Sequence, residues 1–423
     1  MCRRGPLRHK AAPAGDCAVL PWRSPIKDRP VNTSITLVRP VSASLLWLLG
    51  SLAAIAPLST DMYLPAFALI RADIGAAAGE IELSFSAYFI GMLIGMLCYG
   101  PVSDQFGRKR PLLFGLALYV LAGLAITQVH CLATLVVWRF VQGIGGCAGA
   151  VLTFAIIRDR CDLKQSARNL SLLVLIMGAA PVVAPLLGSW VIAVTGWRGI
   201  FWGLAVFGGL MFLGVWRVLD DPRPLHSGAG FAAVASEYRA LLAEGRFMTF
   251  VSVQAVVMAA MFSYIIGSPL LLIDVHRITP EHFGYFFGAN ALGVMLAGYC
   301  NRLLLPRFTP LEILRAALLL PMVGGTLLVI NAQLVDSTLW LLLPGLFLAV
   351  IAVGFVNPNA SALAMAAQER RAGKAAAILN SATFGGGMLV GLLLNLCYTG
   401  TTAPVAWLIF ACGLLAVYCG RWL

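Results

Sequence analysis

Residues 81–129 read IELSFSAYFIGMLIGMLCYGPVSDQFGRKRPLLFGLALYVLAGLAITQV. Two apolar runs, 81–102 and 111–129, flank a short connection that carries Arg108, Lys109 and Arg110. Each run is about as long as the roughly 20 residues that a helix needs to cross a bilayer core of ~30 Å. The stretch therefore predicts two membrane-spanning helices joined by a short basic loop.

The same pattern fills most of the chain, which has 423 residues, 60% of them hydrophobic and 11% charged. Soluble domains carry about 25% charged residues, so a soluble fold is excluded. Long continuous runs favour helices over a barrel, whose strands alternate in polarity. We predict an all-α polytopic membrane protein with twelve transmembrane helices in two pseudo-symmetric six-helix bundles. The predicted spans are 42–69, 81–102, 111–129, 131–157, 169–194, 198–217, 248–273, 283–305, 313–333, 338–362, 374–398 and 403–420.

The basic residues indicate how these spans are oriented. With both termini inside, 26 Lys and Arg lie on the inner side and three lie outside, while Arg139 falls within a span. Such a bias is typical of membrane proteins whose cytoplasmic loops retain the positive charge. The net charge of +12 therefore reflects topology rather than nucleic-acid binding. We expect a multi-pass protein of the bacterial inner membrane with both termini in the cytoplasm.

Four segments follow from this division. Residues 1–40 form a basic segment with no long apolar run, which predicts a disordered cytoplasmic tail without a cleaved signal peptide; a mis-assigned start codon is the alternative. Residues 41–217 and 248–423 are six-span halves of 177 and 176 residues, joined by a linker at 218–247 with a helical segment near 231–244. Equal halves favour a binding site at the midplane between them.

Enzyme chemistry has no sequence support. The chain has no phosphate-binding G-x-x-x-x-G-K-[ST] run, no H-E-x-x-H and no G-x-S-x-G. Gly143, Gly145 and Gly146 lie inside a span, where small residues let helices approach closely. The ten cysteines are scattered, which favours buried thiols over a metal site or disulfides. We predict no enzyme activity, no cofactor and no metal, so the energy for transport must come from an ion gradient.

A gradient-driven transporter needs a titratable group within the membrane. Asp61 is the acidic residue well inside a span, and Arg139 is the corresponding basic residue. Counting from Arg71 and His130, both lie on the order of 14 Å below the outer surface. Intramembrane ionisable residues are costly and indicate function. We predict that Asp61 and Arg139 form a pair or share a cavity, where protonation, cargo binding and the Arg139 contact compete. The alternative is that Asp61 caps an unwound end of span 1 near Pro57 and Pro65.

Polar and aromatic residues within other spans suit a large, mostly apolar pocket. Gln142 lies one turn beyond Arg139 on the same face. Each such residue can instead serve helix–helix hydrogen bonding. The predicted substrate-cavity residues are Tyr88, Gln142, Gln254, Tyr264, Asn290, Asn357, Asn359, Asn380 and Phe384.

Span 5 contains Gly178, Pro181, Pro185 and Gly188. Prolines remove helix hydrogen bonds and glycines permit close contact. This combination predicts a bent gating helix, with an ordinary kinked span as the alternative.

The loop after span 2, Gly100-Pro-Val-Ser-Asp104-Gln-Phe-Gly107-Arg108-Lys109-Arg110, resembles the major facilitator superfamily signature G-x-L-A-D-R-x-G-R-K-x-x-L. Here Gly100 is expected to allow close packing and Gly107 a tight turn, while Asp104 pairs with Arg108 and Lys109 holds the loop inside. Val102 and Gln105 depart from that signature.

In span 4, the run from Arg139 through Gln142 to Gly145 is similar to the R-x-x-Q-G-x-G signature of proton-coupled members of the same superfamily. Short runs at 61–66, 184–188, 196–198, 267–269 and 358–360 resemble its Bcr/CflA drug-resistance branch, from which Ser189 and Lys374 depart. The resemblance implies drug:proton antiport with the Asp61 and Arg139 positions central.

The sequence thus predicts a proton-coupled exporter of small amphipathic drug-like compounds, a monomer whose partners are its substrate, protons and the lipid bilayer. Alternatives are an exporter of an endogenous metabolite and a proton symporter. A receptor or scaffold without transport does not need an acid and a base at one depth in the bilayer.

Overall fold

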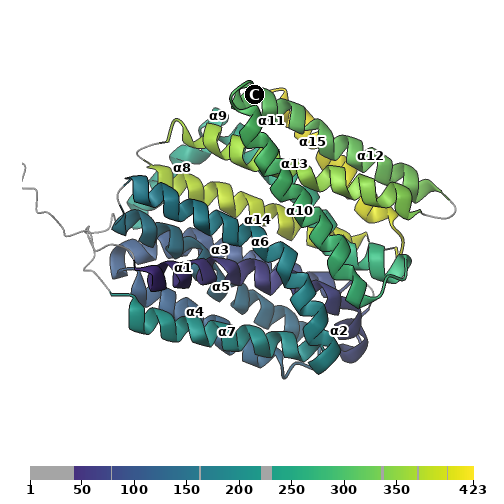
Figure 1. Cartoon of the computed structure of the whole chain (residues 1–423), viewed down its shortest axis with the longest axis horizontal. Coiled ribbons are helices and arrows are strands. Elements are labelled where there is room, and N and C mark those ends of the chain that lie inside the picture. Colours follow the sequence, from purple (N-terminus) through teal and green to yellow (C-terminus); the bar gives the residue numbers. More distant parts are fainter. Residues whose placement is uncertain are drawn as a thin grey trace, which may run out of the picture. The chain divides into compact units, whose positions relative to one another are not determined.

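The long apolar runs fold into helices along the whole described chain (Figure 1). The computed structural model describes residues 42–77, 79–161, 163–220, 231–334, 338–368, 371–397 and 399–423, so the predicted tail 1–40 lies outside them. The elements are α1 Ala43–Asp61, η1 Leu64–Ala66, α2 Phe67–Ile74, α3 Ile81–Phe106, α4 Lys109–Ile126, α5 Leu132–Arg160, α6 Leu163–Thr195, α7 Trp197–Val218, α8 Phe231–Leu242, α9 Gly245–Pro269, η2 Leu270–Val275, α10 Pro280–Leu304, α11 Pro310–Ala317, α12 Leu319–Gln333, α13 Leu339–Met365, α14 Ala372–Leu396 and α15 Ala403–Gly420.

Twelve spans are long and apolar enough to cross a membrane within the described residues. The first, Ala43–Ile74, combines α1, η1 and α2, and the seventh, Gly245–Val275, combines α9 and η2. The predicted number of spans and the all-helical fold class are therefore confirmed. The protein is a multi-pass membrane protein.

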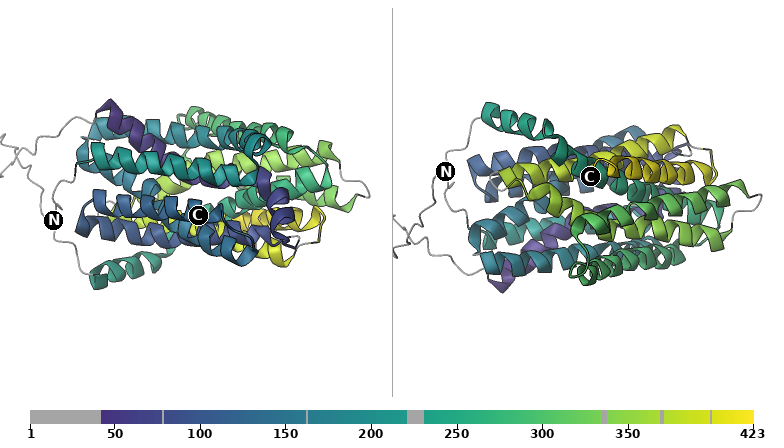
Figure 2. Two further views of the ribbon diagram at one scale, coloured as in Figure 1. Left: turned by 90° about the horizontal axis from the view of Figure 1, so that it is seen from below. Right: turned by 90° about the horizontal axis from the view of Figure 1, so that it is seen from above.

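The spans form two bundles that lie side by side, with the earlier helices in one and the later helices in the other (Figures 1 and 2). In the first bundle α3 and α4 pack on α5, and α1 packs on α6. In the second bundle α12 packs on α13 and α15, and α9 packs on α13. The bundles meet where α3 packs on α14 and α6 packs on α10.

The first span of each bundle loses regular α-helical geometry towards one end. α1 contains Pro57 and ends at Asp61, and a short 3₁₀ turn with Pro65 separates it from α2. α9 ends at Pro269 and continues as the π-helix η2. Both breaks follow from proline, which removes a backbone donor and crowds the preceding turn. Such interruptions often mark functional sites in helices.

Close helix contacts in the first bundle depend on glycine, as the run in span 4 predicts. A Cβ atom placed on Gly143 of α5 would overlap the carbonyl oxygen of Tyr88 on α3. A Cβ atom on Gly145 would lie 2.5 Å from the backbone nitrogen of Tyr119 on α4. The absence of side chains at these positions lets three helices pack backbone against backbone. The prediction of close approach at Gly143 and Gly145 is confirmed.

Candidate functional site

A cavity of about 1240 Å³ lies between the two bundles. It is larger than the roughly 300–1,000 Å³ of ordinary small-molecule sites. Its walls come from α1, α3, α5 and α6 on one side and from α9, α13 and α14 on the other, with α8 at its edge. A space of this size has room for a drug-sized molecule together with water.

The cavity is open towards one end of the bundles. Its lining reaches Asp104, Arg108, Glu237, Arg371 and Lys374, which surround the α3–α4 and α13–α14 connections. We call this the basic end. The other end carries the connections 75–80 and 276–279, which contribute no residue to the lining in the described part of the chain. We call it the opposite end.

Asp61 lines the deep part of this cavity. It is the last residue of α1, and one of its carboxylate oxygens, Oδ1, accepts a hydrogen bond of 2.9 Å from the hydroxyl of Thr60. The helix therefore does end there, as the alternative interpretation predicts. The carboxylate, however, accepts no recorded hydrogen bond from the backbone of the following turn, so it is not a helix cap. Asp61 thus lies on the cavity wall while its side chain is mostly buried, with 4% of the residue exposed.

Arg139 of α5 is completely buried beside the same break. Its Nη1 atom donates to the carbonyl oxygen of Ser59 at 3.2 Å and to Oε1 of Gln142 at 2.8 Å. The guanidinium carbon lies 4.6 Å and 4.4 Å from the ring centroids of Tyr63 and Tyr88. Arg139 thus lies near the level of Asp61, as the matched depths predict.

The predicted contact between Asp61 and Arg139 needs correction in this conformation. No ion pair joins them among the described residues, and Arg139 does not line the cavity. The aromatic rings of Tyr63 and Tyr88 hold the guanidinium instead, each such contact being worth about 2 kcal/mol when desolvated. The Nε and Nη2 atoms of Arg139 are buried without a hydrogen-bond partner. The buried cation therefore retains donors that a carboxylate in another conformation can use.

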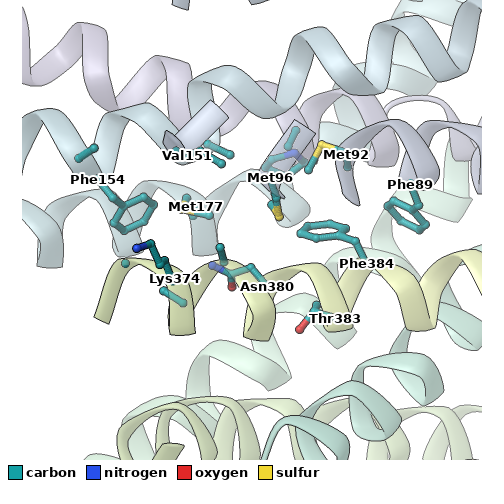
Figure 3. A pocket seen from close by; sticks show the side chains of 18 of the residues that line it. Phe89, Met92, Met96, Val151, Phe154, Met177, Lys374, Asn380, Thr383 and Phe384 are labelled. Atoms are coloured by element: carbon teal, nitrogen blue, oxygen red, sulfur yellow. The ribbon is translucent and has the colours of Figure 1, made fainter. Parts of the chain in front are cut away.

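Aromatic and thioether side chains form a prominent part of the cavity wall (Figure 3). Phe89 of α3 lies 4.5 Å from Phe262 of α9 and 5.5 Å from Phe384 of α14, measured between ring centroids. This cluster joins the two bundles at the deep side of the cavity. Met92 and Met96 continue the wall towards the basic end. Such surfaces adapt to many apolar shapes.

Five of the nine predicted cavity residues line the cavity: Tyr88, Gln254, Asn357, Asn380 and Phe384. Asn380 is exposed to the cavity, and in Figure 3 it lies between Lys374 and Phe384 along α14. Gln254 accepts a hydrogen bond of 3.0 Å from Ser361 and is held on α9 against α13. Gln254, Asn357 and Asn380 thus add uncharged polar groups to a wall whose charged residues are Asp61 and those of the basic end.

The other four, Gln142, Tyr264, Asn290 and Asn359, do not line it. Gln142 is buried and receives the Arg139 hydrogen bond. Asn290 of α10 donates to the hydroxyl of Tyr264 of α9 at 3.1 Å. Asn359 of α13 donates to Asn301 of α10 at 2.6 Å. For these four the prediction is corrected to the alternative, hydrogen bonding between or within helices, because burial favours partners inside the bundle over an open cavity.

The loop after α3 has the predicted ion pair between Asp104 and Arg108, and a second pair, with Asp159, that was not predicted. Arg108 contacts Asp104 at 2.7 Å and Asp159 of α5 at 2.8 Å. Gly107 has a φ of 82°, a conformation that side chains disfavour, so it makes the predicted turn. Lys109 donates to the carbonyl oxygen of Trp216 at 2.8 Å. The expectation for Gly100 is wrong in this conformation: a Cβ atom there would meet nothing within 4 Å, since Gly100 faces the cavity.

Both prolines of span 5 lie inside the continuous helix α6. Pro181 lines the cavity, and a Cβ atom on Gly188 would overlap the carbonyl oxygen of Met62, just beyond Asp61. Gly178 lies beside Met295 of α10 without crowding. α6 thus packs tightly on the broken first span at one point and faces the cavity at another, while its gating role stays a prediction.

At the opposite end the two bundles are joined by polar contacts. Arg71 of α2 forms an ion pair of 3.2 Å with Asp274 of η2. The amide of Asn395 on α14 donates to the carbonyl oxygen of Gly79 at 2.8 Å. Glu82, at the start of α3, lies beside this pair in a small pocket and keeps its Oε2 atom buried without a hydrogen-bond partner. These contacts close the opposite end.

A sequence profile of the Major Facilitator Superfamily matches residues 49–392. The chain belongs to this superfamily. Its solved structural relatives include the D-xylose–proton symporter, with a TM-score of 0.69 at 14% identity over 90% of this chain and 96% of that one. The E. coli xylose transporter XylE in a partially occluded inward-open conformation matches with the same TM-score and identity over 89% and 96%. At this identity the likeness concerns the fold alone.

Sequence relatives within the superfamily cover most of the chain. The uncharacterized MFS-type transporter YdgK of Bacillus subtilis is 32% identical over 87% of this chain and 92% of its own length. A bicyclomycin resistance protein homolog of Haemophilus influenzae is 26% identical over 87% and 93%. The multidrug resistance protein MdtL of Klebsiella pneumoniae is 28% identical over 79% and 83%. The chain is therefore a transporter of this superfamily rather than an enzyme, and it resembles drug-resistance members.

Two further ion pairs of this transporter were not predicted from the sequence. The first is the pair of Arg71 and Asp274, because Arg71 served only as a marker of the outer side. The second joins Glu237 of α8 to Lys374 of α14 at the edge of the cavity. Lys374 departs from the pattern of the Bcr/CflA branch. Its partner Glu237 lies 137 positions earlier, in the linker, and no sequence pattern predicts their contact.

Proposed function

We propose that the chain is a proton-coupled secondary transporter that exports small amphipathic drug-like compounds across the bacterial inner membrane by alternating access. The observation that carries this proposal is the placement of Asp61 on the wall of a large apolar cavity that is open at the basic end. A carboxyl group at this place can exchange protons with the cavity and can also contact a cationic or polar cargo group. The proposal therefore joins proton binding and cargo binding at one residue.

The orientation follows from the basic end. Positive loops stay in the cytoplasm, so the cavity faces the cytoplasm and both termini lie there. The Arg71–Asp274 contact then closes the outer side. Cargo enters from the cytoplasm, and separation of Arg71 from Asp274 opens the path outward. The halves 41–217 and 248–423 move against each other, with 218–247 as their linker.

Arg139 acts as a positioning residue in this mechanism. It binds the carbonyl oxygen of Ser59, two residues before Asp61, and so holds the end of α1. Its unpartnered Nε and Nη2 atoms offer a carboxylate-binding site next to the break. When Asp61 loses its proton, its carboxylate can move to these donors. Cargo binding, protonation and the Arg139 contact then exclude one another, which is the condition for antiport.

The cargo class follows from the wall and from the names of the relatives. Phe89, Phe262 and Phe384 offer apolar faces, while Asn357 and Asn380 offer hydrogen bonds. A pocket with few polar groups binds amphipathic molecules of varied shape. Relatives named for bicyclomycin and multidrug resistance support export of drug-like compounds.

The decisive experiment compares wild type with Asp61→Asn in everted membrane vesicles. We expect Asp61→Asn to be inserted normally and to lose proton release on addition of a transported compound. The matched control is Asp73→Asn, because Asp73 pairs with Arg198 within the first bundle and lies outside the cavity. Normal proton-coupled export by Asp61→Asn would overturn the proposal. If the compound and protons move in the same direction, and are not exchanged for one another, the proposed mechanism would change from antiport to symport.

A further inference from the structure

An ion pair between the linker helix and the second bundle lies at the edge of the cavity. The ammonium of Lys374, in the first turn of α14, contacts the carboxylate of Glu237 on α8. Both side chains line the same cavity as Asp61, and they are 25% and 36% exposed. Figure 3 shows the Lys374 side chain beside the cavity, at the end away from Phe89. The lysine is therefore turned into the cavity mouth and not merely extended to bulk solvent.

The other cations of the lining differ in how firmly they are held. Arg108 contacts two carboxylates, those of Asp104 and Asp159. Lys374 has the single carboxylate of Glu237, and Arg371, one turn earlier, forms no ion pair with the residues that the structure describes. An ion pair that is about one-third exposed contributes little net free energy. Lys374 can thus exchange its partner for another carboxylate at small cost.

We propose that Lys374 binds the anionic group of the cargo, and that Glu237 occupies this subsite as a replaceable carboxylate while the cavity is empty. The inference rests on the proposed function and names its substrate class. Arg371 adds a second positive charge beside the subsite. A cargo carboxylate that takes the place of Glu237 also releases α8 from α14.

The separation between Asp61 and Lys374 along the cavity sets the length of the cargo. Arg139 contacts both the carbonyl oxygen of Ser59, two residues before Asp61, and the ring of Tyr88. Phe384 contacts Phe89, the next residue after Tyr88, so Phe384 lies near the depth of Asp61 along α14. Ten residues of helix separate Phe384 from Lys374, a rise of ~15 Å. The wall between them carries Met92, Met96 and Asn380. The cavity therefore suits an elongated zwitterion with its cationic group at Asp61, an apolar middle, and its carboxylate at Lys374.

A probe set with one common body tests this inference. 4′-(Aminomethyl)biphenyl-4-carboxylate is a zwitterion, its methyl ester is a cation, and its N-acetyl derivative is an anion. Binding is measured by equilibrium dialysis to the full chain in lipid nanodiscs. We expect the zwitterion to bind wild type more tightly than the ester. Lys374→Met, which keeps an unbranched side chain but removes the charge, should reduce this preference about 5- to 10-fold, within the range of a typical net hydrogen bond.

Two further variants separate charge from packing. Lys374→Arg keeps the cation and should keep the preference for the zwitterion. Glu237→Gln removes the competing carboxylate and should increase this preference several-fold. An equal loss of zwitterion and ester binding in Lys374→Met would assign Lys374 a structural role and overturn the inference. Wild type that does not prefer the zwitterion would overturn it as well.

Proton release distinguishes this inference from the proposed function. A pH-sensitive dye in vesicles reports protons released when the zwitterion is added. A Lys374-dependent preference without proton release supports the subsite and overturns the antiport mechanism. Proton release that depends on Asp61, with no Lys374-dependent preference, supports the antiport mechanism and overturns the subsite.

Discussion

The two six-helix bundles differ in the polar groups that they bury. In the first bundle Arg139 is buried between the rings of Tyr63 and Tyr88, next to the break at Asp61. Among the residues that the structure describes in the second bundle, the buried polar side chains are neutral, and Asn359 and Asn301 share a hydrogen bond there. A carboxyl group such as that of Asp61 can bind and release a proton, whereas an amide cannot. A fold with matching halves can therefore bury charged groups in one half and neutral amides in the other, while both halves contribute to the cavity wall.

The largest expected effect is at the charged centre. Arg139→Lys keeps the charge but removes the planar group that stacks on Tyr63 and Tyr88 and holds the carbonyl of Ser59. We expect proton-coupled export in vesicles to fall on the order of 10²-fold, as for other misplaced functional groups. Arg198→Lys, at a partly exposed guanidinium, is the control. Wild-type export by Arg139→Lys would remove the distinction between the bundles.

Packing should not distinguish the bundles. A Cβ atom on Gly143 would overlap the carbonyl oxygen of Tyr88, and one on Gly354 of α13 would lie 2.5 Å from the carbonyl oxygen of Val294. Gly143→Ala and Gly354→Ala should each destabilise the purified protein by about 1–3 kcal/mol, through overpacking. Thermal unfolding in detergent measures this. Gly203→Ala, where nothing lies within 4 Å, should show no loss.

A neutral centre should matter less than the charged one. Asn359→Leu removes the 2.6 Å hydrogen bond to Asn301 and leaves that side chain without this partner. We expect a loss of about 1 kcal/mol in stability, in line with interhelical hydrogen bonds in membrane proteins. Proton release per exported molecule, measured in the same vesicles, should equal that of wild type. A change in this ratio would show that the second bundle takes part in coupling.

The contact between the bundles at the opposite end should have a smaller effect. Asp274→Asn removes the ion pair with Arg71, whose side chains are 29% and 30% exposed. An exposed pair is worth about 0.2–1 kcal/mol, so the equilibrium should shift towards the outward-open state by only a few-fold. Labelling of an introduced cysteine at Thr60, on the cavity wall, by an external maleimide measures the shift. The exchange of both charges, Arg71→Asp with Asp274→Arg, should restore the wild-type rate.

The smallest expected effect is a shift in the labelling of Cys131, which tests the assigned orientation of the spans in the membrane. Cys131 is exposed just before α5, and its hydrogen bonds with Thr134 hold the pKa of the thiol below its usual value. The reactive thiolate should therefore persist to lower pH than in an ordinary cysteine. We expect an impermeant maleimide to label Cys131 in intact cells, with a pH midpoint that rises in Thr134→Val.

The control is a cysteine at the basic end. Ala240→Cys, exposed on α8, should react only after permeabilisation. The labelling is performed in a background with the other exposed cysteines replaced. Labelling of residue 240 in intact cells would reverse the assigned orientation.

The spans follow directly from the sequence, which also offered the break at Asp61 as an alternative and put Gln142 on the same helix face as Arg139. Length and hydropathy define the spans, prolines mark the break, and a spacing of three residues puts two side chains on one helix face. The cavity wall does not follow in the same way. A span that is apolar all round gives no sign of which face meets a neighbour and which meets a cavity. The prediction that Gln142, Tyr264, Asn290 and Asn359 line the cavity was wrong for this reason.

The 3₁₀ turn Leu64–Ala66 gives the first span a further property. Asp61 lies on one side of this turn and Arg71 lies on the other, ten residues later. Only five residues, 62–66, separate α1 from α2, and Pro65 is one of them, so few torsions are free to absorb a displacement. When the Asp61 carboxyl changes its partner, we expect α1 to tilt. This tilt should move α2, and with it Arg71, because the connection between the two helices is short. The five residues between α1 and α2 would then connect proton binding at Asp61 to the separation of Arg71 from Asp274.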